Sequence, residues 1–205
     1  IVALLSLGIF LVTAIPMRTS GFMSDGMQIL DVLAGKQSVV ERTTLLQITA
    51  QSLAGVRPRD WDSEGIRKVA QLTSDEPLRQ ILAWQLLLYR SSDCGDASGI
   101  KKYGELLADN VDRFPDGFRQ AIYIELAICA GMSNDSERAN LHLVRAKGGV
   151  VEKSRRLLAE ATIAVLEHRH ESAKVLKRKA LQSLSSTMDP GLGKLTEEQL
   201  NKLAV

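Results

Sequence analysis

The sequence is poor in the residues that nucleic-acid-binding proteins need. Aromatic residues make up 4% of the 205 residues, and the formal net charge is only +2. Surfaces that bind nucleic acid combine positive charge with aromatic side chains on which the bases stack. We therefore expect no nucleic-acid partner.

Cysteine is also scarce. The two cysteines, Cys94 and Cys129, are 35 residues apart, with no CxxC pair and no histidine at metal-ligand spacing. Free cysteines behave as small apolar side chains and are commonly buried. We interpret both as reduced thiols in or near a helical core.

No segment of useful length alternates between apolar and polar residues as a half-buried strand does. Apolar residues instead recur at helical spacing, and most of the five prolines fall between the periodic segments. The pattern predicts an all-α fold. A helix is expected to follow Gly26 and to stop at Gly35, with Ser24 or Asp25 as its N-cap. Further helices are expected over 38–53, 63–73, 75–91, 97–113 and 116–131.

The first seventeen residues form an uncharged apolar run. Sixteen residues to Pro16 would span only about 24 Å as a helix, whereas the hydrocarbon core of a bilayer is about 30 Å thick. Because the chain begins at Ile1, we expect it to be part of a longer protein in which residues 1–17 end a transmembrane helix. A signal-peptide core, with 12–14 as a cleavage-like site, is the alternative. Three basic residues after the run favour a cytoplasmic C-terminal part: Arg18, Lys36 and Arg42.

The C-terminal half contains an internal repeat in which one glutamate and two alanines recur at an offset of 34 residues. Alanines seven residues apart place small side chains on one helix face, where a neighbouring helix can approach closely. A 34-residue helix–turn–helix period is that of tetratricopeptide-type repeats. An earlier and poorer copy is expected at Ala97 and Gly104, with an offset of 42. The repeated residues are Glu137, Ala139 and Ala146, then Glu171, Ala173 and Ala180.

Asp25 is the candidate functional residue of the N-terminal region. It follows the apolar run and immediately precedes an amphipathic helix, and ionisable groups near membrane-embedded segments are commonly functional. The alternative is that Asp25 acts as an ordinary helix cap, because Ser-Asp-Gly before an apolar run is typical of an N-terminus.

The segments 14–16 and 24–30, Ala-Ile-Pro and Ser-Asp-Gly-Met-Gln-Ile-Leu, resemble the third-ligand region of the site-2-protease family of intramembrane zinc metallopeptidases. The resemblance implies that Asp25 is the third zinc ligand and that Pro16, Ser24 and Gly26 support it. In this family two histidines of an upstream HExxH helix provide the other ligands, and its glutamate is the general base. Three protein ligands leave one position of the zinc for the water that hydrolyses the peptide bond.

The resemblance extends along the chain. Residues 53–62 resemble the junction to a tetratricopeptide-like helical domain in a bacterial subgroup of the family, and residues 137–149 resemble a later repeat of that domain. The implied organisation is the end of a transmembrane helix over 1–17, an Asp-Gly ligand loop and short helix over 18–36, and a tetratricopeptide-like domain over 37–205.

This chain departs from the family in two ways. Thr13 and Ala14 stand where the family has an asparagine before the proline turn, and the 205 residues contain no HExxH. The three histidines lie far along the chain and have no recognisable metal spacing. We therefore expect no catalytic residue in this chain and no activity by this chain alone. The histidines are His142, His168 and His170.

Two functions remain open. The first is the C-terminal part of a zinc metallopeptidase of the bacterial inner membrane, with a cytoplasmic helical domain that recognises protein or peptide substrates. The second is a membrane-anchored or exported tetratricopeptide-like scaffold without chemistry. The region 145–179 has ten Lys and Arg against four Asp and Glu. It indicates contact with anionic lipid or an acidic partner, or else a solvated helix face.

Overall fold

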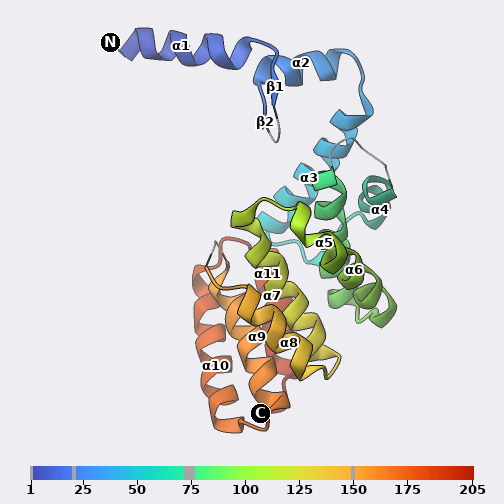
Figure 1. The fold of residues 1–205 in the computed structure, drawn as a ribbon, viewed down its shortest axis with the longest axis vertical. Coiled ribbons are helices and arrows are strands. Elements are labelled where there is room, and N and C mark those ends of the chain that lie inside the picture. Colours follow the sequence, from blue (N-terminus) through green and yellow to red (C-terminus); the bar gives the residue numbers. More distant parts are fainter. Residues whose placement is uncertain (1, 20–21, 72–76, 149–150) are drawn as a thin grey trace. The chain divides into compact units, whose positions relative to one another are not determined.

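The structure, a computed structural model, describes residues 2–19, 22–71, 77–148 and 151–205 (Figure 1). Helices account for 81% of it, which confirms the all-α prediction. The one departure in the described residues is a ribbon of two antiparallel strands, β1 (Arg18–Thr19) and β2 (Phe22–Met23), in which Arg18 is opposite Met23. With two residues per strand, it is a local turn structure rather than a sheet.

The chain divides into two compact units, Ile1–Thr44 and Leu45–Val205, which meet within α3 (Gln37–Leu53). The first unit contains α1 (Val2–Ala14), the β1–β2 ribbon and α2 (Asp25–Leu33). The second unit contains α4 (Ser63–Gln71), α5 (Pro77–Cys94), α6 (Ala97–Asn110), α7 (Asp116–Met132), α8 (Ser136–Arg145), α9 (Lys153–Leu166), α10 (His170–Ser183) and α11 (Pro190–Lys202). Three short 3-10 turns lie between them: Pro58–Asp60 (η1), Val111–Arg113 (η2) and Leu184–Ser186 (η3).

The helix boundaries follow the predicted signals closely. α2 is capped by Ser24 and is followed by Gly35 at a φ of +62°, as predicted. α6 ends at Asn110, and η2 completes the segment predicted as 97–113. The predicted helical positions 72–73 and 75–76 lie outside the described residues.

The second unit is built from helical hairpins: α5 packs on α6, α7 on α8, and α9 on α10 (Figure 1). Each hairpin turn contains one residue with positive φ, which reverses the chain after the first helix. These residues are Gly95, Asn134 and His168, with φ values of +70°, +59° and +58°. The last two are 34 residues apart, as are the repeated alanines, whereas the first two are 39 apart.

The four repeated alanines are fully buried, at the fourth and eleventh positions after the N-caps of α8 and α10. Ala146 is the C-cap of α8, and the other three lie within the helices. The predicted earlier copy is wrong in its register. Ala97 is exposed, and the fourth and eleventh positions after Asp96, the N-cap of α6, are Ile100 and Leu107. The first hairpin therefore uses large side chains where the later two use alanine, and this change hides it from a search for repeated small residues.

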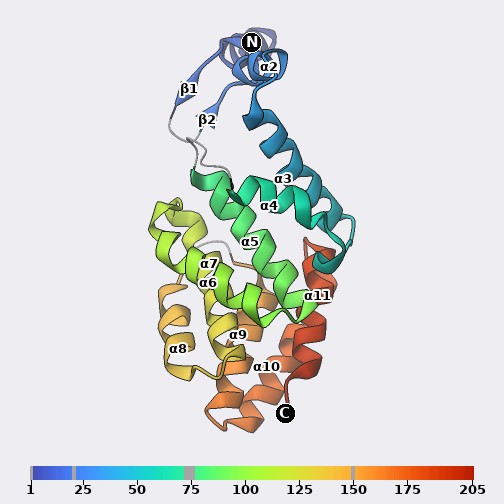
Figure 2. The same cartoon turned by 90° about the vertical axis from the view of Figure 1, so that its right-hand side faces the viewer.

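The last helix, α11, returns along the hairpins to the start of the second unit. Leu200 belongs to a hydrophobic cluster with Ile128 of α7 and Leu158 of α9, and Leu195 belongs to another with Leu87 of α5. Figure 2 shows α11 on the side of α5, α7 and α9 that faces away from α6 and α8. α11 therefore holds the first helices of all three hairpins together.

Polar contacts fix α11 to the end of α3 and to the segment between α3 and α4. The Ser52 hydroxyl donates to the Asp189 carboxylate at 2.6 Å, and Asp189 also caps α11 by accepting from the Leu192 amide at 2.9 Å. Arg57 donates to both Asp93 of α5 and Glu198 of α11. These carboxylates keep the pKa of Arg57 above its ordinary value, with the hydrogen bond to Asp93 as the main cause.

Both tryptophans have structural roles. Trp61 anchors the turn before α4: its side chain is buried, and its indole N–H donates to the Val56 carbonyl at 3.1 Å. Trp84 is buried in the core between α5 and α6, beside Leu88 and Leu107.

Candidate functional site

Ser24 joins the end of α1 to the start of α2. Its side chain is buried, and its hydroxyl donates to the Ile15 carbonyl at 2.7 Å. The same oxygen accepts from the amide of Met17 at 2.9 Å and from that of Met27 at 3.3 Å. Ser24 is thus both the N-cap of α2 and a clamp on the turn around Pro16.

Pro16 and Gly26 complete this corner. α1 ends at Ala14 because Pro16 has no N–H to donate and restricts the backbone of Ile15 before it. Gly26 lies against that end: a Cβ at this position would be 1.9 Å from the Ala14 carbonyl oxygen and 3.3 Å from the Pro16 nitrogen. The structure therefore brings the three predicted supporting residues together, and the packing of α1 on α2 requires glycine at 26.

Asp25 is the first residue of α2 and is exposed. It is not the N-cap, since that position belongs to Ser24. No hydrogen bond or ion pair involves the Asp25 carboxylate among the described residues, so the corner presents it without a partner. The described residues also contain no group of three or more His, Cys, Asp or Glu side chains placed to hold a metal ion. The described residues therefore provide one carboxylate that could act as a zinc ligand, that of Asp25, but no complete zinc site.

The histidines and cysteines of the second unit form no site with one another. His168, in the turn before α10, and His170, the first residue of α10, are both exposed, and their ring centroids are 6.2 Å apart. His142 is buried in α8 against Tyr123. Cys94 is exposed, which corrects its predicted place near the core. Cys129 is in the helical interior, where burial raises the pKa of its thiol to about 12.

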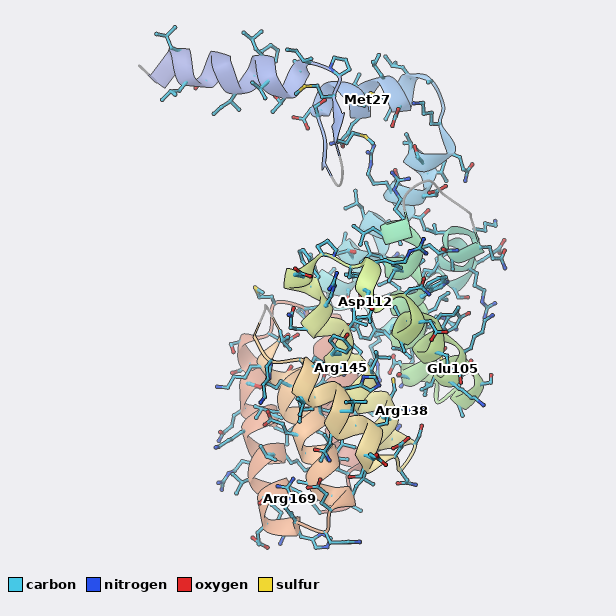
Figure 3. The ribbon with its side chains drawn as sticks, viewed as in Figure 1. Met27, Glu105, Asp112, Arg138, Arg145 and Arg169 are labelled. Atoms are coloured by element: carbon cyan, nitrogen blue, oxygen red, sulfur yellow. The ribbon has the colours of Figure 1, made fainter. Side chains whose placement is uncertain are left out.

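The basic region 145–179 is largely engaged within the chain. Arg155 is buried and paired with Glu125, Arg169 pairs with Glu167, and Lys174 pairs with Glu171. Arg156 and Lys177 donate to backbone carbonyls, and Arg145 lies over the Tyr123 ring. Arg145 and Arg169 also lie on well-separated parts of the unit (Figure 3). Six of the ten basic residues of this region are therefore engaged within the chain, and contact of the region with anionic lipid or an acidic partner stays a prediction.

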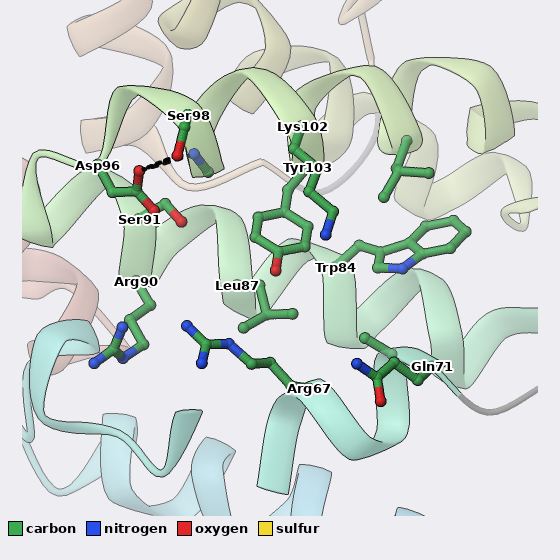
Figure 4. A pocket seen from close by; sticks show the side chains of 13 residues that line it. Arg67, Gln71, Trp84, Leu87, Arg90, Ser91, Asp96, Ser98, Lys102 and Tyr103 are labelled. Carbon is green, nitrogen blue, oxygen red and sulfur yellow. Dashed lines mark hydrogen bonds between the residues drawn. The ribbon is translucent and has the colours of Figure 1, made fainter. Parts of the chain in front are cut away.

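A pocket that the sequence did not predict lies between α4, α5 and α6, with a volume of about 550 Å³ (Figure 4). Arg67 of α4, Arg90 of α5 and Lys102 of α6 line it, and among the described lining residues one is acidic, Asp96. Its apolar lining is contributed by Ala70, Trp84, Leu87, Tyr103 and Leu106. The sequence shows only that three successive helices each contain a basic residue. It does not show that these residues meet, because that depends on how the helices pack.

No helix in the described part of the chain combines the length and the apolar character needed to cross a bilayer. α1 has 13 residues and a length of about 20 Å. Comparison with known protein families, with curated proteins and with solved structures finds no match.

Proposed function

We propose that this chain is the C-terminal part of a membrane-embedded zinc metallopeptidase of the site-2-protease type, with Asp25 as one zinc ligand. The observation that carries the proposal is the corner formed by Pro16, Ser24 and Gly26. These are the residues that the resemblance selects, and together they hold, beside the end of an apolar helix, a carboxylate that has no partner among the described residues.

The surface of the first unit supports a membrane location for this corner. The large apolar side chains of α1 that are described are exposed, with Leu4 74%, Ile9 66% and Phe10 64% accessible. Ile29 and Leu33 of α2 are 60% and 78% accessible. Contiguous apolar surface of this kind marks contact with lipid or with another protein. A bacterial inner membrane is the environment we propose, with the second unit on the cytoplasmic side.

The other zinc ligands, and the glutamate that acts as general base in the family, would come from an HExxH segment outside this sequence. Zinc held in this way activates water for hydrolysis of a peptide bond. The role of this chain is to position Asp25. Its hairpin domain, which we assign to the tetratricopeptide-like class, would recognise or regulate protein substrates. The 34-residue spacing of the buried alanines and of the turn residues Asn134 and His168 supports that assignment.

The test is the zinc content and proteolytic activity of the full-length protein that contains this sequence, as wild type and as Asp25→Ala. We expect near-stoichiometric zinc in the wild type. We expect the variant to lose zinc and to lose activity at least about 100-fold, because removal of a ligand exceeds the effect of removing a group that only supports one.

The chain provides a matched control. Asp116 is also an exposed first residue of a helix and is also followed by glycine, Gly117. Asp116→Ala should retain both zinc and activity. Equal zinc content in the wild type and Asp25→Ala would refute the role of Asp25.

The second candidate function is a membrane-anchored binding scaffold without catalysis. The pocket between α4, α5 and α6 favours it, since this pocket can bind a partner without any metal. Absence of zinc from wild-type full-length protein that is correctly folded would make this the better account.

A further inference from the structure

The described residues that line the pocket between α4, α5 and α6 include more cations than carboxylates. Among the described residues, neither Arg67 nor Arg90 forms a hydrogen bond or ion pair, although Arg57, Arg119 and Arg155 of the same unit each pair with a carboxylate. The Arg90 Nε atom is buried without an acceptor. A buried donor without an acceptor is unfavourable, so a ligand that offers an acceptor to this group would gain a favourable hydrogen bond.

Asp96, the acidic residue among the described lining residues, is already engaged. Asp96 is the N-cap of α6: its Oδ1 atom accepts from the Ser98 hydroxyl at 2.7 Å and from the Gly99 amide at 3.0 Å. Figure 4 shows this cap at one end of the pocket. The Ser98 hydrogen bond is the main reason that the pKa of Asp96 lies below its ordinary value. The described lining therefore has three cations and one carboxylate, which also interacts electrostatically with Arg67, so its net charge is positive.

The remaining lining is apolar or aromatic. Leu87 lies between the α4 and α6 side chains, and Tyr103 and Lys102 reach into the pocket from α6 (Figure 4). The Lys102 ammonium is 5.3 Å from the centre of the Tyr103 ring. A volume of about 550 Å³ is within the range of ligand sites and accommodates several side chains. A suitable ligand therefore combines negative charge with apolar surface.

We propose that this pocket binds an acidic segment of a partner polypeptide. Arg67 and Arg90 would hold its Asp or Glu carboxylates, because the planar guanidinium group matches a carboxylate through two parallel hydrogen bonds. A neighbouring apolar side chain of the segment would contact Leu87 and Tyr103. The proposal goes beyond the metallopeptidase assignment and does not depend on it, since no residue of the pocket belongs to the Asp25 corner.

The experiment measures fluorescence anisotropy of a short labelled peptide, made of glutamates with one leucine and one tyrosine, on addition of the complete 205-residue chain in mild detergent. We expect saturable binding that weakens as salt is added, because part of the attraction is between exposed charges. A peptide with glutamine in place of every glutamate should bind at least about tenfold more weakly.

Arg67→Gln and Arg90→Gln should each weaken binding about tenfold, the effect of losing one charge-assisted contact. Arg178→Gln is the matched control, because Arg178 is an exposed arginine on α10 without a hydrogen bond or ion pair among the described residues. Arg67 is itself exposed, so Arg67→Glu tests the same charge with little risk to folding, and unchanged circular dichroism would verify this.

Three results would overturn the proposal. The first is equal binding of the glutamate and glutamine peptides. The second is equal binding by wild type, Arg67→Glu and Arg178→Gln. The third is binding of inorganic phosphate by a chain that does not bind the peptide, which would make the pocket a site for small anions. Asp25→Ala should bind the peptide like the wild type, so failure of this proposal and failure of the zinc proposal are separate results.

Discussion

Breaking the buried ion pair between Glu125 of α7 and Arg155 of α9 should strongly destabilise the second unit. Both side chains are 5% exposed, and the guanidinium group donates to both carboxylate oxygens. Arg155 also donates to Gln199 of α11 at 2.7 Å and lies 5.7 Å from the centre of the Tyr89 ring. Four helices, α5, α7, α9 and α11, therefore meet at one charged group.

Glu125→Gln removes the charge that compensates Arg155 and leaves that arginine buried. Breaking a buried pair in this way reduces the free energy of unfolding by about 3–5 kcal/mol, which is a large part of the 5–15 kcal/mol typical of a domain. With an m-value of about 2.5 kcal/mol/M, the urea midpoint should fall by about 1–2 M. The assay is tryptophan fluorescence, because both tryptophans, Trp61 and Trp84, lie in the second unit.

Replacing both partners separates the charge effect from a loss of packing. Glu125→Leu combined with Arg155→Met should be within about 1 kcal/mol of the wild type or more stable, since no buried charge is left unpaired. The exposed pair Glu171 and Lys174 on α10 is the control, and Glu171→Gln should leave the midpoint unchanged. A shift of less than about 0.3 M urea for Glu125→Gln would contradict the burial of this pair.

Two further predictions concern packing and protonation. Gly26→Ala should destabilise the first unit by about 1–3 kcal/mol, because the added Cβ clashes with the Ala14 carbonyl. Hydrogen exchange in α2 should then be faster. Gly117→Ala is the control: Gly117 is likewise the second residue of its helix but has open space around it, so this substitution should be neutral or stabilising. Burial, followed by two neighbouring arginines, lowers the pKa of His142, so the unfolded chain binds a proton more readily. The free energy of unfolding should therefore fall as the pH drops below about 6.5, and His142→Gln should remove that part of the pH dependence; equal slopes in urea titrations of the two proteins would exclude the effect.

Local features of the sequence predicted the helices and their caps well. Apolar periodicity located α2 to α7, and the Ser24 and Gly35 signals fixed both ends of α2. The 34-residue offset of the alanines predicted two equivalent hairpins, because a helix that packs closely on its neighbour needs a small residue at each contact. These properties depend on residues close together in the chain.

Features that depend on distant residues were missed. α11 contains Gly191 and Gly193, which weaken a helical pattern, although Asp189-Pro190 was a usable start signal. Gly191 is required because a Cβ there would be 2.4 Å from the Val56 carbonyl oxygen, a contact that no local pattern reveals. The unpaired arginines of the pocket were likewise unpredictable, because whether a charge has a partner is decided only by packing.

The return of α11 changes how the second unit can fold. In an open stack of hairpins each repeat contacts only its neighbours, and the ends can unravel independently. Here Ser52 of α3 and Asp189, the N-cap of α11, are 137 positions apart and are joined by a hydrogen bond. The first and last helices of the unit therefore stabilise one another. Unravelling from either end therefore disrupts contacts at the other, which makes the unit cooperative. On the ribosome these contacts cannot form until α11 has been synthesised, so the earlier hairpins expose until then the apolar surface that α11 covers. Because contacts between distant residues slow folding, the unit should fold more slowly than its local helical contacts alone would suggest.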